Sequence, residues 1–154
     1  MTDADPAPPW WEATSIPALL RAARRTYGSA TQAALAEAGC DDMPTNGSFV
    51  VGAIARGGSP LSGIIAALGV SKQAAGQLVD TLVVRGYLER TPDPDDRRRM
   101  TLDLTDRGRT AASTVGEAVR AVDARLAERV GIDAVAQARA VLGALVELRD
   151  EGPD

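Results

Sequence analysis

Apolar side chains recur every three or four positions over much of the chain, which is the period of a helix with one buried face. The first such stretch is expected to begin at Ser15, a good N-cap, to carry Pro17 in its first turn and to end at Gly39. A second, weaker helical face covers residues 44–56, because the two glycines inside it each cost about 1 kcal/mol relative to alanine. Residues 1–13 are rich in proline and aspartate and are expected to form a loose lead-in.

The pattern then indicates two short helices joined by a tight turn. Ser59 and Pro60 form a typical helix start, and Gly69 ends this helix after one short apolar face. The second helix is expected to cover about 71–85, with Ser71 as its cap. Because the turn between the two helices is short and contains glycine, the pair predicts a helix-turn-helix.

After this pair the period of the pattern changes from helical to two. The stretch from Tyr87 to Arg90 has the pattern of a short strand, and Met100 to Leu104 alternates apolar and polar side chains as a second strand. Between them, residues 91–99 (TPDPDDRRR) form a charged loop that contains two prolines. A β-hairpin that directly follows a helix-turn-helix predicts a wing.

The C-terminal part of the chain returns to helical spacing. One helix is expected to begin at a Thr105 cap and to end at Gly131, and the last helix to begin at an Asp133 cap. Their apolar seams exceed what one small winged domain can cover, so a homodimer is the simplest arrangement, with some of the same residues in the intrachain core. The residues expected at the dimer interface are Ile16, Leu19, Leu20, Leu126, Val141, Leu145 and Leu148.

The predicted fold is therefore mainly α with a small β-hairpin, a winged helix-turn-helix flanked by N- and C-terminal dimerisation helices. The length of 154 residues suits one domain. Within this domain, 1–154, the winged helix-turn-helix region covers 44–105, and the dimerisation helices cover 15–39 and 106–150.

Composition narrows the chemistry that the chain can perform. Apolar residues make up 45% and charged residues 25%, no apolar run is long enough for a membrane span, and the N-terminus lacks a secretory signal pattern. A soluble, cytoplasmic protein is therefore expected, without a membrane partner. Cys40 is the single cysteine and there is no histidine, which excludes an internal disulfide, a histidine general base and a His- or Cys-rich metal site. No metal, no cofactor and no enzymatic activity are expected.

The distribution of charge qualifies the acidic total. The formal net charge of −4 argues against a general polyanion binder. Between Ser59 and Thr110, however, eight basic residues stand against seven acidic ones, whereas the rest of the chain has nine against fourteen. The middle of the chain is therefore the least acidic part, and its expected wing carries three consecutive arginines.

Four segments occur in a fixed order between residues 61 and 109: LGVSKQAAGQLVDTL, RGYLER, DPDDRRR and LTDRG. In this order and without gaps they closely resemble the MarR family of winged-helix transcription regulators. Asp96 and Arg98 fall on the family's wing Asp-x-Arg pair. The resemblance implies a sequence-specific regulator, a ligand-responsive repressor, that binds a pseudo-palindromic operator in double-stranded DNA as a homodimer.

The exposed side of the second helix of the pair suits the major groove of DNA. Gln73 can bond adenine bidentately, and Lys72 can reach a guanine or a phosphate, while arginines on the wing suit the narrow minor groove. The alternative is an ordinary solvated polar face with a mixed-charge turn. The residues expected to contact DNA are Ser59, Ser62, Ser71, Lys72, Gln73, Gln77, Arg90, Asp96, Arg97, Arg98 and Arg99.

The family resemblance also implies an effector cavity between the dimer helices and the winged region, for a small and often aromatic or phenolic ligand. Large side chains outside the winged segment could line it, although core packing and an anchored N-terminal arm are the alternative for each one. A redox role for Cys40 is disfavoured, because Asp41 and Asp42 beside it oppose a thiolate. The expected effector-pocket residues are Trp10, Trp11, Tyr27, Met43 and Phe49.

A different class of function remains open at this point. The acidic balance is compatible with a protein-interaction module on a winged-helix fold that has lost operator binding. An enzyme is the least favoured class, since the chain offers no nucleophile–base pair, no phosphate-cradling loop and no metal cluster.

Overall fold

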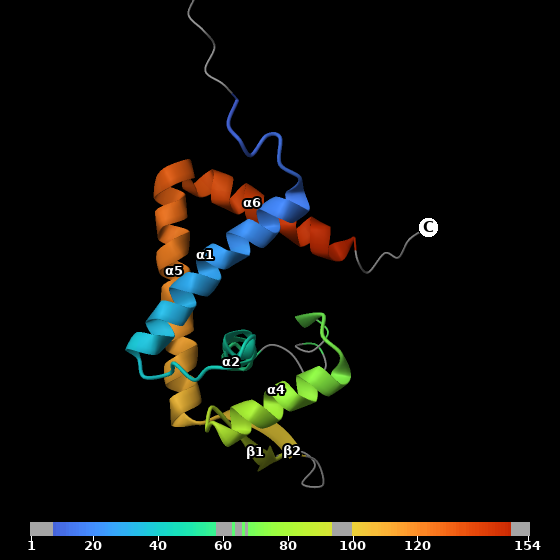
Figure 1. Ribbon diagram of the computed structural model, residues 1–154, viewed down its shortest axis with the longest axis vertical. Coiled ribbons are helices and arrows are strands. Elements are labelled where there is room, and N and C mark those ends of the chain that lie inside the picture. The colour runs from blue at the N-terminus through green and yellow to red at the C-terminus, as the bar shows by residue number, and fades with distance from the viewer. Residues whose placement is uncertain (1–7, 58–62, 64–65, 67, 94–99, 149–154) are drawn as a thin grey trace, which may run out of the picture.

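The computed structural model describes residues 8–57, 63, 66, 68–93 and 100–148 (Figure 1). Its elements in chain order are α1 (Ile16–Glu37), α2 (Gly47–Ala55), α4 (Lys72–Val84), β1 (Leu88–Pro92), β2 (Met100–Leu104), α5 (Asp106–Val130) and α6 (Ile132–Glu147). This order confirms the predicted fold, mainly α with a small β-hairpin. Of the helix predicted to begin at Ser59, residues 63, 66 and 68 are described, and these three are helical.

Local sequence signals explain where most of the helices begin and end. Ser15 precedes α1 in an extended conformation, and Gly39 follows the end of α1 at a φ of 71°. Ser71 and Thr105 each accept a hydrogen bond from a backbone N–H in the first turn of the helix that follows, α4 and α5 respectively. Each of these four positions agrees with the boundary that the sequence predicts.

The start of α6 differs from the prediction. The sequence predicts a cap at Asp133, whereas the N-cap in the structure is Gly131, at a φ of 86°. Gly131 also ends α5, so the chain turns at this one residue and α6 begins at once with Ile132. Asp133 lies instead in the first turn of α6, where a carboxylate interacts favourably with the helix dipole.

The long helix α5 connects the two ends of the molecule (Figure 1). Both α1 and α2 pack against it, and α1 crosses it obliquely. At the C-terminal end of α5 the chain turns into α6, while α4 and the hairpin lie at the opposite end. The winged region and the last helix are therefore held apart by the length of α5.

The hairpin packs its root into the core. β1 and β2 are antiparallel, with Leu88 opposite Leu104 at the root and Pro92 opposite Met100 toward the tip. Leu88 and Leu104 are buried, whereas Met100 is exposed. The core links α1, α2, α4, the hairpin and α5 through buried residues of each. These are Leu35, Cys40, Val50, Val51, Leu82, Tyr87, Leu88, Leu104 and Ala111.

A glycine allows α5 to begin directly against the junction between α4 and β1. A Cβ atom at Gly108 would overlap the carbonyl oxygen of Tyr87 and lie 3.1 Å from Cδ2 of Leu104. Thr105 reinforces this contact, because its hydroxyl donates to the carbonyl oxygens of Gly86 (2.5 Å) and Tyr87 (3.2 Å). The first turn of α5 is thereby held against the end of α4.

Candidate functional site

The N-terminal half of α4 exposes a polar surface that carries no bulky side chain. Ser71 caps the helix by accepting a hydrogen bond from the backbone N–H of Ala74 at 3.2 Å. Lys72, Gln73 and Gln77 are exposed. These three side chains are the residues of α4 that the sequence predicts to contact DNA, and none of them is buried in the core.

The opposite face of α4 is buried, and a hydrogen-bonded capping motif ends the helix. Ala75, Val79 and Leu82 point into the protein. After the helix, the N–H of Gly86 donates to the carbonyl of Val83 (3.0 Å) and the N–H of Tyr87 to the carbonyl of Leu82 (2.9 Å). This pair of bonds is a Schellman motif, for which the positive φ of 72° at Gly86 is required. The helix therefore passes into β1 through a rigid junction.

Arg90 on β1 lies beside α4. Its guanidinium donates to the Asp80 carboxylate at 2.6 Å, and both side chains are about half exposed. An exposed pair of this kind contributes about 1 kcal/mol or less to stability. It does fix the position of Arg90, which the sequence places among the DNA-contacting residues, next to the exposed face of α4. The remaining residues expected to contact DNA lie outside the described part of the chain. These are Ser59, Ser62, Asp96, Arg97, Arg98 and Arg99.

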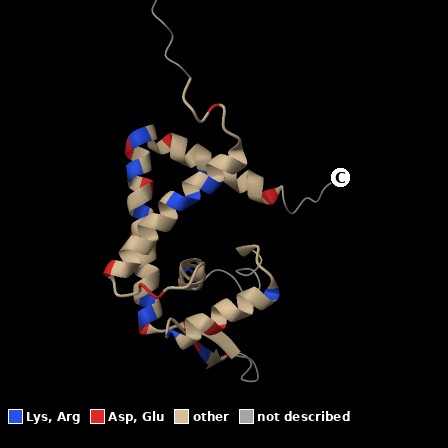
Figure 2. Ribbon diagram, in the orientation of Figure 1, with Lys and Arg blue, Asp and Glu red and all other residues tan. Residues whose placement is uncertain are grey.

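Charged residues are distributed unevenly between the helices (Figure 2). Lys72 and Asp80 are the two charged residues of α4, whereas charges of both signs alternate along α5. The surface of α4 is therefore mainly neutral and polar, which suits hydrogen bonding to base edges more than attraction to phosphates.

A cavity of about 610 Å³ lies among α1, α2 and α5. Tyr27, Met43 and Phe49, three of the five predicted effector residues, line it together. Trp10 and Trp11 are not among its lining residues: their rings form an edge-to-face pair 6.0 Å apart, and both are more than half exposed. The lining residues that the sequence analysis did not single out include Arg24, Thr31, Leu35, Cys40, Asn46, Arg56, Val115 and Val119. Arg24, Tyr27, Thr31 and Leu35 repeat at helical spacing along α1, and that periodicity is the signal by which they could have been found.

One wall of the cavity is connected to α6 by polar side chains. The Tyr27 hydroxyl donates to Asp123 on α5 at 2.6 Å, and Arg139 on α6 forms an ion pair with the same carboxylate at 2.6 Å. The hydrogen bond to Asp123, together with burial, raises the pKa of Tyr27 above its ordinary value, so this phenol stays protonated and remains a donor at neutral pH.

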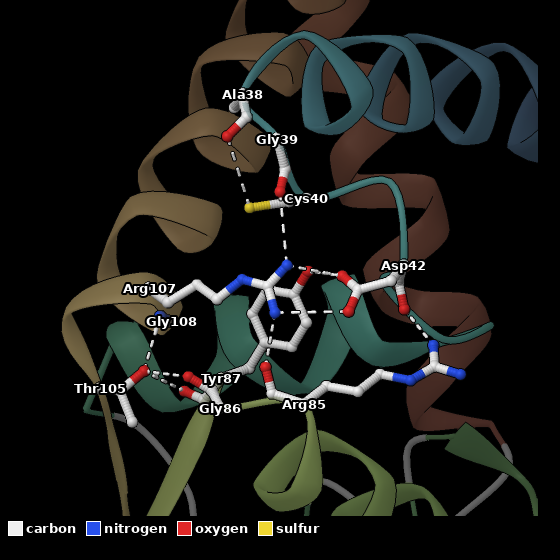
Figure 3. A network of polar contacts seen from close by, with 10 residues as sticks. All are labelled: Ala38, Gly39, Cys40, Asp42, Arg85, Gly86, Tyr87, Thr105, Arg107 and Gly108. Atoms are coloured by element: carbon white, nitrogen blue, oxygen red, sulfur yellow. Dashed lines mark hydrogen bonds and ion pairs between the residues drawn. The ribbon is translucent and has the colours of Figure 1, made fainter.

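A second set of polar contacts lies around Asp42, in the segment between α1 and α2 (Figure 3). Its carboxylate accepts hydrogen bonds from the Tyr87 hydroxyl and from Arg107, while its backbone carbonyl accepts one from Arg85. We call these four residues the Asp42 network. The hydrogen bond from Tyr87, and then Arg107, lowers the pKa of Asp42, and burial raises the pKa of Tyr87 with help from its bond to Asp42. Nothing in the sequence pattern predicts this network.

The last helix exposes an apolar surface. Val135 is the buried residue of α6, whereas large apolar side chains elsewhere on the helix are exposed, such as Val141 at 63% and Leu148 at 60%. Ile16 and Leu20 on α1 are also exposed, while Leu19 is half-buried. We define the exposed apolar face of α6 by Ile132, Val141, Leu142, Leu145, Val146 and Leu148. No helix in the described ranges is long and apolar enough to span a membrane.

Comparisons with known proteins agree with this architecture. A family model described as the MarR family matches residues 42–99. The solved structure of MarR from Oenococcus oeni PSU-1 is 12% identical, with a TM-score of 0.66, and the match covers 86% of this chain and 99% of that one. Over residues 42–99, and in its fold, the chain resembles the MarR family. No match to it is found among curated proteins.

Two further structures have higher identity to this chain. CouR from Rhodococcus jostii RHA1 bound to p-coumaroyl-CoA is 28% identical, with a TM-score of 0.66, covering 86% of this chain and 92% of that one. The transcriptional repressor CouR bound to a 23-mer DNA duplex is 26% identical, with a TM-score of 0.65, covering 89% and 96% respectively. The chain therefore has the winged-helix fold of these regulators over most of its length.

Proposed function

We propose that this chain is a ligand-responsive transcriptional repressor that binds a pseudo-palindromic operator as a homodimer. The observation that carries the proposal is the exposed face of α4, where Lys72, Gln73 and Gln77 stand on a helix whose other face is buried in the core. The likeness to a CouR structure bound to DNA supports it.

In the proposed complex the N-terminal half of α4 enters the major groove. Gln73 is suited to bidentate bonding to adenine, and Lys72, at the first turn, to a guanine or a phosphate. Arg90 reaches the backbone beside α4, since its ion pair with Asp80 already holds it there. We assign Arg97, Arg98 and Arg99 of the expected wing to the minor groove, with Asp96 fixing the shape of the wing, and Ser59 and Ser62 to phosphates.

A homodimer places two such helices on one face of the duplex. The exposed apolar face of α6 and the exposed residues near the start of α1 supply the surface that a second copy would cover. Dimeric helix-turn-helix proteins contact half-sites about 34–36 Å apart, or a multiple of this distance, so operator symmetry follows from protein symmetry.

The cavity among α1, α2 and α5 is the proposed effector site. Tyr27 supplies a hydrogen-bonding phenol, Phe49 and Met43 supply apolar surface, and Arg24 and Arg56 supply positive charge at its lining. This set of groups suits a small aromatic ligand that carries an acidic group. The CouR structure with p-coumaroyl-CoA makes aromatic acids and their CoA thioesters the first ligands to test.

Fluorescence anisotropy with DNA fragments selected from a random pool tests the proposal. We expect the wild-type protein to prefer a near-palindromic sequence and its affinity to fall steeply with salt. Gln73→Ala should lose preference at one position of each half-site, and Lys72→Ala should reduce the salt slope by about 1 per binding site. Arg21→Ala, on the exposed surface of α1, is the matched control and should leave both unchanged.

Two results of this experiment would refute operator binding. One is the absence of any preference over random DNA at moderate salt, and the other is an unchanged affinity in Arg98→Ala together with Lys72→Ala. Either result would favour the alternative, a protein-interaction module on the same fold.

A further inference from the structure

The segment between α1 and α2 contacts the cavity on one side and the junction between α4 and β1 on the other. Cys40, Asp41 and Met43 line the cavity. Asp42, in the middle of the same short segment, directs its carboxylate away toward the end of α4 and the start of α5 (Figure 3). A displacement of this segment on its cavity side therefore moves Asp42 as well.

Asp42 contacts the end of α4, the junction between α4 and β1, and the start of α5. Its carboxylate accepts a hydrogen bond from the hydroxyl of Tyr87, which lies between α4 and β1. Arg107, in the first turn of α5, donates to both carboxylate oxygens, from Nη2 at 2.8 Å and from Nη1 at 3.3 Å. The backbone carbonyl of Asp42 accepts a hydrogen bond from the guanidinium of Arg85, the C-cap of α4. One residue thus joins the α1–α2 segment to the C-terminal end of α4, the root of the wing and α5.

Arg107 closes the network around the same junction. Its Nη1 donates to the carbonyl oxygen of Arg85 at 2.6 Å, and its Nη2 to that of Gly39 at 3.3 Å. The guanidinium lies over the ring of Tyr87, with 4.3 Å between Cζ and the ring centroid. Tyr87 itself is fully buried, and its backbone N–H closes the end of α4. The Asp42 network is therefore built around the junction that orients α4.

We infer that Asp42 is a positioning residue that transmits occupation of the cavity to α4 and the wing. A ligand that pushes on Cys40, Asp41 or Met43 withdraws the Asp42 carboxylate from Tyr87 and Arg107. The Schellman junction then loses its support, and α4 no longer holds one orientation. This inference rests on the proposed function only in that α4 is the helix that reads DNA.

The chain offers a way to push on this segment without knowing the ligand. A Cβ atom added at Gly47 would meet Sδ of Met43 at 2.7 Å and Cγ of Pro44 at 2.9 Å. The Gly47→Ala substitution therefore displaces the segment from the α2 side. Gly52, in the same helix, is its matched control, because a Cβ there meets only Nη1 of Arg56, at an ordinary 3.5 Å.

Amide hydrogen exchange on the full-length protein, without DNA or ligand, tests the inference. The informative amides are those of Arg85, Gly86 and Tyr87, which are hydrogen-bonded in the closed junction. We expect Asp42→Asn to speed their exchange roughly tenfold, as for the loss of a hydrogen bond to a charged group. The amides in the middle of α5 should be unchanged. Glu37→Gln, which changes an exposed carboxylate near the C-terminal end of α1, should leave the junction unchanged.

The Gly47→Ala variant distinguishes a positioning role of Asp42 from a merely structural one, because it disturbs the segment and leaves Asp42 itself unchanged. It should speed exchange at the same three amides, and adding Asp42→Asn to it should produce little further effect, since both act through one set of contacts. Gly52→Ala should leave these amides as in the wild type. If Asp42→Asn fails to fold, Tyr87→Phe, which removes one hydroxyl, replaces it and should give the same local increase.

The outcomes separate this inference from the proposed function. Unchanged exchange at the junction in Asp42→Asn, a uniform increase over the whole protein, or full additivity with Gly47→Ala would each overturn the positioning role, even if the wild type binds an operator. If the local, non-additive increase is found but the wild type shows no preference for any DNA, operator binding fails while the link between the cavity and α4 is supported.

Discussion

The contact between Gly108 and Tyr87 makes a prediction whose size can be worked out. Gly108→Ala adds one methyl group in the first turn of α5, where it would overlap the carbonyl oxygen of Tyr87. This neighbour is backbone and cannot rotate aside, so α5 must move away from the junction. The same carbonyl accepts hydrogen bonds from the N–H and the hydroxyl of Thr105, both at 3.2 Å, and the movement stretches both.

The expected cost is the balance of three terms. Overpacking costs about 1–3 kcal/mol, and a backbone neighbour places this case near the upper end. Weakening two hydrogen bonds, each with a net value of about 0.5–1.5 kcal/mol, adds roughly 1 kcal/mol. The helix propensity of alanine returns up to about 1 kcal/mol. We therefore expect Gly108→Ala to lower the free energy of unfolding by about 3 kcal/mol, which lowers the Tm of a chain of this size by about 6–12 °C.

Thermal unfolding followed by circular dichroism measures this effect, at one fixed protein concentration because the Tm of a dimer depends on it. Gly28→Ala is the matched control, since a Cβ at this position in α1 meets nothing within 4 Å. It should stabilise the protein by about 0.5–1 kcal/mol. A Tm of Gly108→Ala close to that of the wild type, or an equal fall in Gly28→Ala, would refute the close-approach argument.

Three further perturbations have defined outcomes. Leu82→Ala opens a cavity at a fully buried position and should cost about 2–5 kcal/mol in urea unfolding, whereas a cost below 1 kcal/mol would contradict the described core. The pKa of Asp42 is lowered from its ordinary 3.8 in the folded state, so its contribution to stability is complete above about pH 5 and is lost as the pH falls further. Unfolding midpoints measured from about pH 6 to pH 3 should therefore fall more in the wild type than in Asp42→Asn, and parallel curves would contradict the network. Leu145→Asp should reduce the mass measured by analytical ultracentrifugation from that of a dimer to that of a monomer, and an unchanged dimer would exclude the α6 face as the interface.

The parts of the fold that could be predicted depend on local signals. Ser71 and Gly86 bracket α4 because a serine cap and a glycine at positive φ act on their own helix ends and need no distant partner. Thr105 marks the start of α5 for the same reason. The error at α6 is also local in origin. Asp133 and Gly131 are both compatible with a helix start, and the sequence pattern marks the glycine only as the end of α5.

The Asp42 network could not be predicted because its partners are far apart in the sequence. Asp42 meets Tyr87 and Arg107 across separations of 45 and 65 residues, and next to Asp41 it has the pattern of a solvated acidic pair. Arg90 illustrates the same limit, since its ion pair with Asp80 depends on how the wing lies against α4. Tertiary contacts of polar residues leave no periodicity, so the sequence shows the residues but not their pairing.

The arrangement around α5 connects the proposed effector site to the proposed DNA-binding surface. A helix of 25 residues is about 37 Å long at 1.5 Å per residue, which is close to the 34–36 Å between successive major-groove faces of DNA. In the proposed dimer the two chains meet near the α6 end of this helix, and α4 lies at the other end. A rotation of about 10° at the α6 end then moves α4 by roughly 6 Å, estimated from that length. The cavity is connected to α6 through Tyr27, whose partner Asp123 forms the ion pair with Arg139. It is connected to α4 through the segment that contains Asp42. In the proposed dimer, displacing either connection would change the separation of the two DNA-reading helices, so we expect a ligand in the cavity to oppose DNA binding.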